Sequence, residues 1–168
     1  MKRYHFIAIG GSAMNSLAIA LKEQGNQITG SDDAIFDPSR TKLIKAGIHP
    51  KKMGWYPEKI STDLDAVILG MHAKPDNLEL LAAQSLKLKI YSYPEFIAHL
   101  AYRKTRVVIA GSHGKTTISA MVLHVLNYHG RSVDFMLGGQ LAGFNNSVSL
   151  TKNNDFIFYM VNNVLESI

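Results

Sequence analysis

The chain contains no cysteine in its 168 residues, which excludes disulfides, thiolate nucleophiles and cysteine-ligated metals. It also has no apolar run of about 18 residues, the length that a membrane-spanning helix requires. The apolar segment near the amino terminus is broken by Gly10-Gly11 and Asn15-Ser16, so no signal peptide is predicted. We therefore expect a cytoplasmic protein with no membrane partner.

Concentrated charge is absent as well. Lys and Arg total 18 against 13 Asp and Glu, a net charge of +5, but the basic residues are scattered. Because no basic tract is interleaved with aromatic residues, we do not predict nucleic acid as a partner. Hydrophobic residues make up 46% of the chain, ample for one large domain or two small ones.

Strand-like and helix-like segments alternate, which predicts α/β units built around parallel sheets. The charged segment 102–105 is the expected boundary between a Rossmann-like domain, residues 1–103, and the start of a phosphate-loop domain, residues 104–168. We predict strands at Tyr4–Ile9, Gln27–Gly30, Ala66–Gly70, Lys89–Ser92, Arg106–Ala110, Ser132–Met136 and Asp155–Tyr159, and helices near Ser12–Gln24, Pro38–Ala46, Asn77–Lys87, Tyr93–Ala101 and Lys115–His129.

The segment Val107–Thr117 has the pattern of a phosphate-binding loop: a buried-type strand, a glycine turn, Lys115-Thr116 and an apolar helix. Loop amides and a helix N-terminus attract anions, and a lysine and a hydroxyl suit outer phosphates and Mg²⁺. The general pattern would place a glycine at position 109, where this chain has Ile109. The alternative is an ordinary strand–turn–helix whose Gly-Lys-Thr only starts the helix.

A second glycine loop, Gly10-Gly11, follows the first predicted strand. A dinucleotide fingerprint would need further glycines, but Asp32 and Asp33 lie at the distance where an acidic residue meets a ribose hydroxyl. Alternatively, the glycines only turn the chain and the aspartates cap the next helix. The loop leaves these interpretations open, and a nicotinamide site is weakly supported.

Taken together, the two loops and their order resemble the amino-acid ligases of peptidoglycan synthesis, the Mur ligase family. The resemblance covers residues 5 to about 159. It rests on His5–Met14, Gly30–Asp32, Pro38-Ser39, Gly47-Ile48, Ala110–Thr117, Gly138-Gly139 and Asn145–Ser147, and the shortened family loop accounts for Ile109. Two members begin this way, the alanine-adding ligase and the recycling ligase that attaches a tripeptide. Segments 31–39 and 138–144 are more similar to the recycling enzyme.

The resemblance implies ATP-driven amide formation on a UDP-N-acetylmuramate-type substrate, with an acyl phosphate as intermediate. It implies that Lys115 is catalytic and that Thr116 ligates Mg²⁺. ATP would be bound by Gly111, Ser112, His113, Gly114, Lys115, Thr116 and Thr117. The UDP substrate would be bound by Gly10, Gly11, Ser12, Ala13, Met14, Asp32 and His72. His113 could equally serve only to orient the turn. His72 could equally be a solvated residue at a strand end with no binding role.

One departure from the family affects the metal. The strand after the ATP loop normally ends in an acidic cluster that binds magnesium, whereas this chain has Met160, Asn162 and Asn163 and no carboxylate before Glu166. Family members continue into a further domain that presents the amino acid or peptide acceptor. We therefore expect either a ligase whose catalytic apparatus is incomplete in this chain or a non-catalytic nucleotide-binding module.

Three smaller expectations concern the core and the sheet edge. Met14, Met121 and Met136 are predicted to be core residues. His5, His49, His99, His124 and His129 are predicted to have surface or partly buried positions. Residues 104–168 should supply three strands and one long helix, leaving 156–161 as an apolar edge that self-associates or stays loosely ordered.

Overall fold

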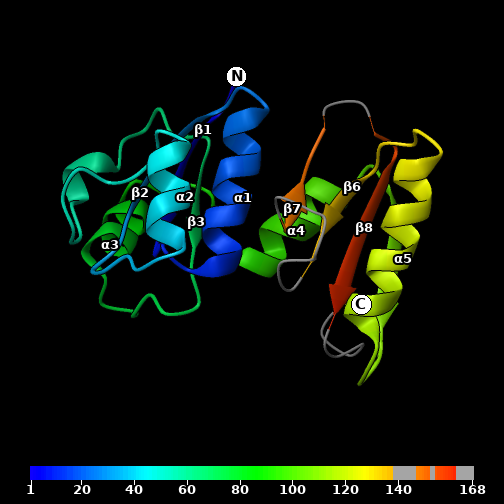
Figure 1. Ribbon diagram of the computed structural model, residues 1–168. Coiled ribbons are helices and arrows are strands. Elements are labelled where there is room, and N and C mark those ends of the chain that lie inside the picture. The colour runs from blue at the N-terminus through cyan, green and yellow to red at the C-terminus, as the bar shows by residue number, and fades with distance from the viewer. Residues whose placement is uncertain (138–146, 152–153, 162–168) are drawn as a thin grey trace. The chain divides into compact units, whose positions relative to one another are not determined.

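A computed structural model describes residues 1–137, 147–151 and 154–161. The chain forms two compact units, Met1–His99 and Leu100–Ile168, and each contains its own four-stranded sheet (Figure 1). The predicted α/β class is confirmed, and all seven predicted strands are present, with each end within two residues of the predicted one. No helix among the described residues is both long and apolar enough to cross a membrane.

The first sheet is fully parallel and has the strand order β2-β1-β3-β4. The chain leaves β1 for β2 on one side and then returns to β3 on the other side, so the order reverses at the carboxyl ends of β1 and β3. This reversal is the place where α/β sheets bind ligands.

The elements are β1 (Arg3–Ile7), α1 (Ser12–Glu23), β2 (Gln27–Ser31), α2 (Ser39–Lys45), the 3₁₀ helix η1 (Pro57–Lys59), β3 (Ala66–Leu69), α3 (Leu78–Ser85), β4 (Ile90–Ser92) and α4 (Tyr93–Ala101).

The core of the first unit lies around β1 and α1. After Arg3, every residue of β1 is buried, as expected for a central strand covered on both faces. The helix α1 buries the continuous segment 14–21 and lies beside α2 (Figure 1). The backbone of the glycine loop between β1 and α1 is therefore fixed by the best-packed elements of the unit.

The same backbone turn ends four of the helices. A glycine with positive φ follows α1, α2 and α5, namely Gly25, Gly47 and Gly130. After α3 the position is taken by Lys87, with φ +52°, and the next amide, Leu88 N, donates to Ala83 O at 3.0 Å. Since this turn favours glycine, Lys87 is the strained member of the set.

The second unit has the strand order β5-β8-β6-β7. The strands β5 (Thr105–Ala110), β8 (Phe156–Val161) and β6 (Asp134–Met136) are parallel, β7 (Val148–Ser149) is antiparallel, and the helix is α5 (Lys115–Tyr128). The expected three strands were therefore one too few, because the two residues of β7 are too short to give a sequence pattern.

The expectation that 156–161 forms the sheet edge was wrong. β8 pairs with β5 on one side and with β6 on the other, so its continuous apolar run is that of a central strand. Among the described strands the edges are β5 and β7. Self-association through β8 accordingly loses its basis.

A partly buried ion pair joins the residue before β5 to the first residue of β6. Lys104 Nζ lies 2.5 Å from Asp134 Oδ2, and the Asp134 side chain is fully buried. The other oxygen of Asp134 accepts bonds from the amide and hydroxyl of Thr151 and from the amide of Asn154. This cluster lies at the opposite ends of the strands from the loop that follows β5.

Burial corrects one of the three methionine predictions. Met14 and Met136 are core residues, but Met121 on α5 is 64% exposed. It belongs to an apolar stripe on the outer side of that helix, at spacings of three and four residues: Ile118, Met121, Val125 and Tyr128.

Candidate functional site

The first glycine loop lies where the strand order reverses. β1 ends at Ile7, α1 begins at Ser12, and Gly10-Gly11 lies between them. Because β1, β2 and β3 are parallel, their carboxyl ends lie at one edge of the sheet. The predicted residues of this loop, Asp32 after β2 and His72 after β3 are therefore brought to the same edge (Figure 1).

Asp32 holds the glycine loop directly. Its Oδ2 accepts a hydrogen bond from Gly10 N at 2.7 Å, and a Cβ added to Gly10 would lie 2.9 Å from that oxygen and 3.0 Å from Ile35. Gly10 is thus required for close approach of the loop to the carboxylate. Asp32 does not cap the next helix: its Oδ2 accepts from Gly10 N, and the carboxylate at the start of α2 is that of Asp37, whose Oδ1 accepts from Thr41 N at 3.0 Å.

The pKa of Asp32 is raised above its ordinary value. Burial of the carboxyl is the largest cause, and the neighbouring carboxyl of Asp33 adds to the rise. Hydrogen bonds from the amides of Gly10 and Ala34 act in the opposite direction but do not cancel it. The carboxylate is therefore held at an energetic cost that the loop contacts only partly offset.

The amino terminus of α1 is an open anion-binding position. Its first helical hydrogen bond is Asn15 N to Gly11 O at 2.8 Å, which leaves the amides of Ser12, Ala13 and Met14 without helical acceptors. No side chain caps this end, and its first turn contains no acidic residue. These amides can bind an anion such as a diphosphate, whereas the Met14 side chain is buried in the core.

Two residues that sequence reasoning missed support the loop. Asn15 is buried, and its amide donates to Gly11 O at 2.9 Å and to Ser39 Oγ at 2.8 Å, which joins the loop to the start of α2. Ala8 has a φ of +65°, and both Ala8 N and Ile9 N donate to Ser31 O. A polar residue inside a helix and a strained alanine leave no signal in a single sequence.

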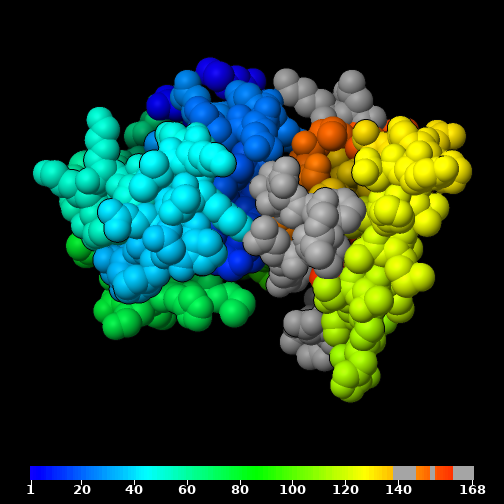
Figure 2. Space-filling model, viewed as in Figure 1, coloured from blue at the N-terminus to red at the C-terminus, as the bar shows by residue number. Residues whose placement is uncertain are grey.

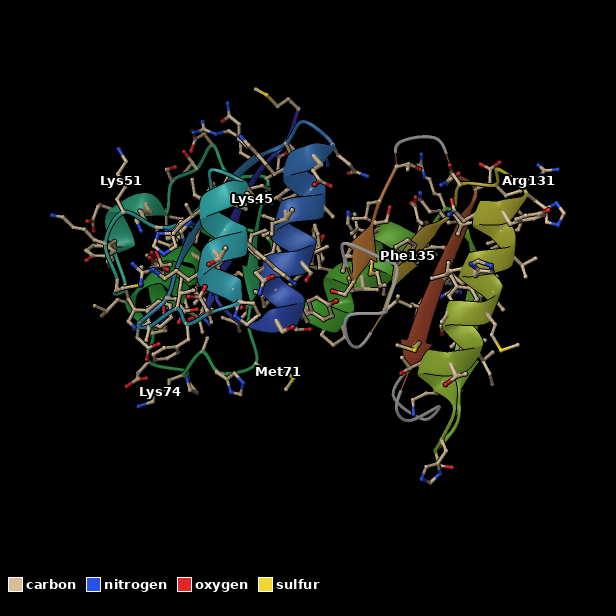
Figure 3. The ribbon with its side chains drawn as sticks, in the orientation of Figure 1. Lys45, Lys51, Met71, Lys74, Arg131 and Phe135 are labelled. Carbon is tan, nitrogen blue, oxygen red and sulfur yellow. The ribbon has the colours of Figure 1, made fainter. Side chains whose placement is uncertain are left out.

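His72 lies in the exposed loop that follows β3. Gly70, at the start of this loop, donates its amide to Ile7 O at 2.9 Å, so the loop begins against the end of β1. Met71 and Lys74 point outward from the same loop (Figure 3). The structure thus brings the His72 loop to the same strand ends as the glycine loop.

A pocket of about 390 Å³ continues from the Asp32 side of this edge. Ile35, which lies against Gly10, forms part of its wall. The pocket carries basic side chains beside an exposed aromatic one, and its lining segments belong to the light-blue and cyan surface in Figure 2. The lining residues are Asp33, Ala34, Ile35, Phe36, Arg40, His49, Pro50, Lys51 and Met53.

The second loop has the geometry of a helix-start phosphate cradle. Gly114 has a φ of +76° and directly precedes α5, whose first turn contains no acidic residue. Lys115 Nζ donates to Gly111 O at 2.5 Å, and His113 Nδ1 lies 3.2 Å from Ser112 Oγ. The predicted ATP residues are thus contiguous around one turn, and Gly111–Gly114, Thr116 and Thr117 are exposed.

The described residues offer little for a divalent cation. Residues 1–137, 147–151 and 154–161 contain no group of three His, Asp or Glu that could hold a metal. Thr116 supplies one hydroxyl oxygen, whereas Mg²⁺ prefers several oxygen ligands, carboxylates among them. Asn162, Asn163 and Glu166 lie outside the described residues.

The matching family model is that of the Mur ligase family, catalytic domain, over residues 3–105, and the chain belongs to this family. It is 34% identical over 147 residues to the UDP-N-acetylmuramate--L-alanine ligase of Carboxydothermus hydrogenoformans, covering 86% of this chain and 31% of that relative. The chain therefore spans about a third of the length of the curated relatives that it matches.

Two solved structures have the same fold. The UDP-N-acetylmuramate:L-alanyl-gamma-D-glutamyl-meso-diaminopimelate ligase from Neisseria meningitides matches with a TM-score of 0.80 and 29% identity, over 95% of this chain and 52% of that one. The UDP-N-acetylmuramate-alanine ligase from Thermotoga maritima matches with a TM-score of 0.77 and 27% identity, over 96% and 37%. Both enzyme types predicted from the sequence are thus among the similar proteins.

Proposed function

We propose that the first unit binds a UDP-N-acetylmuramate-type substrate and that the loop after β5 binds ATP. The chain is then the amino-terminal part of a cytoplasmic, ATP-dependent carbon–nitrogen ligase of peptidoglycan precursor synthesis or recycling. Family membership supports the reaction class. The amino acid or peptide acceptor would be bound by a part of the ligase outside these two units.

The observation that supports the proposal most is Ile35, which lies against Gly10 of the glycine loop and also lines the pocket. The free amides of 12–14 suit a diphosphate, and the basic and aromatic pocket suits the nucleoside beyond it. In this arrangement Asp32 lies on the nucleoside side, and the His72 loop faces the diphosphate. A nicotinamide dinucleotide is a poorer fit, because the later glycines of its fingerprint are missing.

In the second unit, Lys115 is proposed to neutralise the transferring phosphoryl group while loop amides 111–114 hold the neighbouring phosphate. The muramoyl carboxylate attacks the γ-phosphorus of ATP, ADP leaves, and an acyl phosphate forms. An amine then attacks the acyl carbon and inorganic phosphate leaves, which completes the amide. Thr116 supplies only one oxygen for Mg²⁺, so no step is assigned to the metal.

Between the two enzyme types we favour the murein peptide ligase, on the similarity of segments 31–39 and 138–144. Segment 138–144 lies outside the described residues. The alanine-adding ligase is the alternative, and it is also the type of the curated relatives. A non-catalytic nucleotide-binding module is a second candidate, favoured by the lack of an acidic metal cluster in the part of the chain that the structure describes.

Isothermal titration of the full chain with UDP-N-acetylmuramate, UDP and NAD tests the first half of the proposal. Binding of both UDP species without NAD is expected. If NAD binds and neither UDP species does, the substrate assignment is wrong.

A further inference from the structure

A fully buried carboxylate below the candidate site joins three separate segments of the first unit. Glu79 on α3 receives a bond from His5 Nε2 at 3.1 Å through Oε2, and from Tyr56 N at 2.8 Å through Oε1. His5 on β1 is also fully buried, contrary to the expected surface or partly buried position, and its Nδ1 lies 2.8 Å from Thr29 Oγ1 on β2. The other four of these histidines are exposed or half-buried, as expected.

This carboxylate remains charged in the interior. Burial raises the pKa of Glu79, but hydrogen bonds from His5, Ser31 and the amide of Tyr56 outweigh it, and the net pKa is lowered. A buried carboxylate that loses a donor becomes costly, so its donors are held in place. The Tyr56 amide is therefore a fixed point of the loop between β2 and β3.

From Tyr56 the contacts lead to the pocket. The Tyr56 hydroxyl donates to Met53 O at 2.7 Å, and Met53 lines the pocket. Next to it, Gly54 N donates to Asp32 O at 2.7 Å. The pocket wall 49–53 is thus joined to Glu79 through Tyr56 and to Asp32 through Gly54.

Lys59 adds a third attachment of the same loop. Its ammonium donates to Ser31 Oγ at 2.9 Å and lies 4.6 Å from the centre of the Tyr56 ring. Since Ser31 in turn bonds to Glu79, the end of β2 and the loop share one network.

We propose that the buried His5–Glu79 pair acts as a positioning element for the pocket wall 49–53, transmitted through Tyr56, and so sets the affinity for the nucleoside part of a UDP ligand. This inference rests on the proposed function for its ligand. The position of the wall, however, is a property of the free protein and can be measured without any ligand.

The chain contains a single tryptophan, Trp55, next to Tyr56. Trp55 is half-buried and packs against the cluster formed by Ile7, Ile60, Val67, Leu80 and Ala83. Its fluorescence emission and its quenching by iodide therefore report the placement of this loop directly.

Two substitutions of His5 separate the two bonds of its ring. The amide nitrogen of glutamine lies near the position of Nε2, whereas that of asparagine lies near Nδ1. His5→Gln keeps a donor for Glu79 and loses the Thr29 contact, and His5→Asn does the reverse. We expect His5→Asn to weaken UDP binding at least about tenfold and to increase iodide quenching of Trp55. His5→Gln should stay close to wild type in both measurements.

Asn26→Ala is the matched control, because it removes two hydrogen bonds at the opposite end of the strands, from Lys2 N and to Leu21 O. It should lower thermal stability without changing UDP affinity or quenching. If His5→Asn does not fold, Tyr56→Phe tests the next step of the same path, because it removes only the hydroxyl contact with Met53 and leaves the His5–Glu79 pair intact. It should weaken UDP binding about threefold.

Wild-type quenching and UDP affinity in His5→Asn, or unchanged UDP affinity in Tyr56→Phe, would overturn the positioning role. So would equal losses in the His5→Gln and His5→Asn variants. If the wild-type protein binds no UDP at all, the proposed substrate site is wrong. The quenching comparison between the two His5 variants then decides the positioning role by itself.

Discussion

The chain contains the same local pattern twice, a strand, a glycine loop and a helix, in two different surroundings. In the first unit the strand is buried after Arg3, and the loop is tied to Asp32 and Asn15. In the second unit the strand β5 is an edge strand with five of its six residues exposed, and the loop is bonded mainly to its own Lys115. The motif determines what a loop can bind, but the neighbouring elements determine how firmly the loop is held.

This comparison predicts that the two loops differ in function within this chain. The first loop should bind its ligand without further ordering, because folding already fixes its conformation. The second must be ordered as it binds phosphate, since its side chains are exposed and its strand lacks a second neighbour among the described residues.

The 168-residue chain alone should have no ligase activity. Phosphoryl transfer depends on positioning and on a metal held near the phosphates, and the described residues contain no acidic cluster for that metal. A coupled assay with ATP, UDP-N-acetylmuramate and either alanine or tripeptide should show no phosphate release above background. Turnover that is abolished by Lys115→Ala would show that the second unit is catalytically complete.

The two glycines of the first loop should respond differently to a methyl group. Gly10→Ala would bring Cβ within 2.9 Å of Asp32 Oδ2, whereas at Gly11 the nearest atom lies 3.7 Å away, an ordinary contact. We expect Gly10→Ala to weaken UDP binding by about tenfold or more, equivalent to roughly 1.4 kcal/mol. Gly11→Ala is the control and should keep the fold unchanged. Equal thermal stability and UDP affinity in both variants would mean that the Asp32 contact does not hold the loop.

Two buried carboxyls should give opposite pH dependences of stability. The pKa of Asp32 is raised, so its favourable contribution is complete below the unfolded pKa of about 3.9 and is lost as the pH rises through the folded value. The pKa of Glu79 is lowered, so its contribution is present above about 4.3 and is lost as the pH falls through the folded value.

Denaturant midpoints of Asp32→Asn and Glu79→Gln, measured against wild type from acid to neutral pH, test these signs. Relative to wild type, Asp32→Asn should gain stability as the pH rises, and Glu79→Gln should lose it. Parallel pH profiles for the two variants would contradict the assigned environments of these carboxyls.

The smallest predicted effect concerns the helix ends. After α3, Lys87 has a φ of +52° at the position in the turn where other helices have a glycine, namely Gly25, Gly47 and Gly130. Lys87→Gly should raise the free energy of unfolding of the first unit by about 0.5–1 kcal/mol, because an exposed left-handed residue is replaced without loss of packing. Gly25→Ala is the converse control and should lower it. A thermal melt in which Lys87→Gly is destabilised would contradict the strain assigned to this position.

Much of the fold was predictable because continuous apolar runs mark the strands and glycine marks the turns. β7 was missed because two residues carry no pattern, and the central place of β8 was missed because a sequence does not specify strand partners. The spacing predicted a glycine loop at the end of each of two strands and an aspartate near the first loop, and the structure brings Asp32 to that loop. The ligands of these residues stay predictions. Asn15, Ala8 and the His5–Glu79 pair were not predicted, because their roles arise from contacts between residues that are distant in sequence or from backbone strain.

The most direct test of the difference between the two loops is isothermal titration of one wild-type sample with UDP-N-acetylmuramate and, separately, with Mg·ATP. We expect the UDP ligand to bind with micromolar affinity and Mg·ATP to bind at least about tenfold more weakly, since the ordering of an exposed loop consumes binding energy. Low-micromolar binding of Mg·ATP together with no binding of the UDP ligand would contradict the proposed difference between the loops.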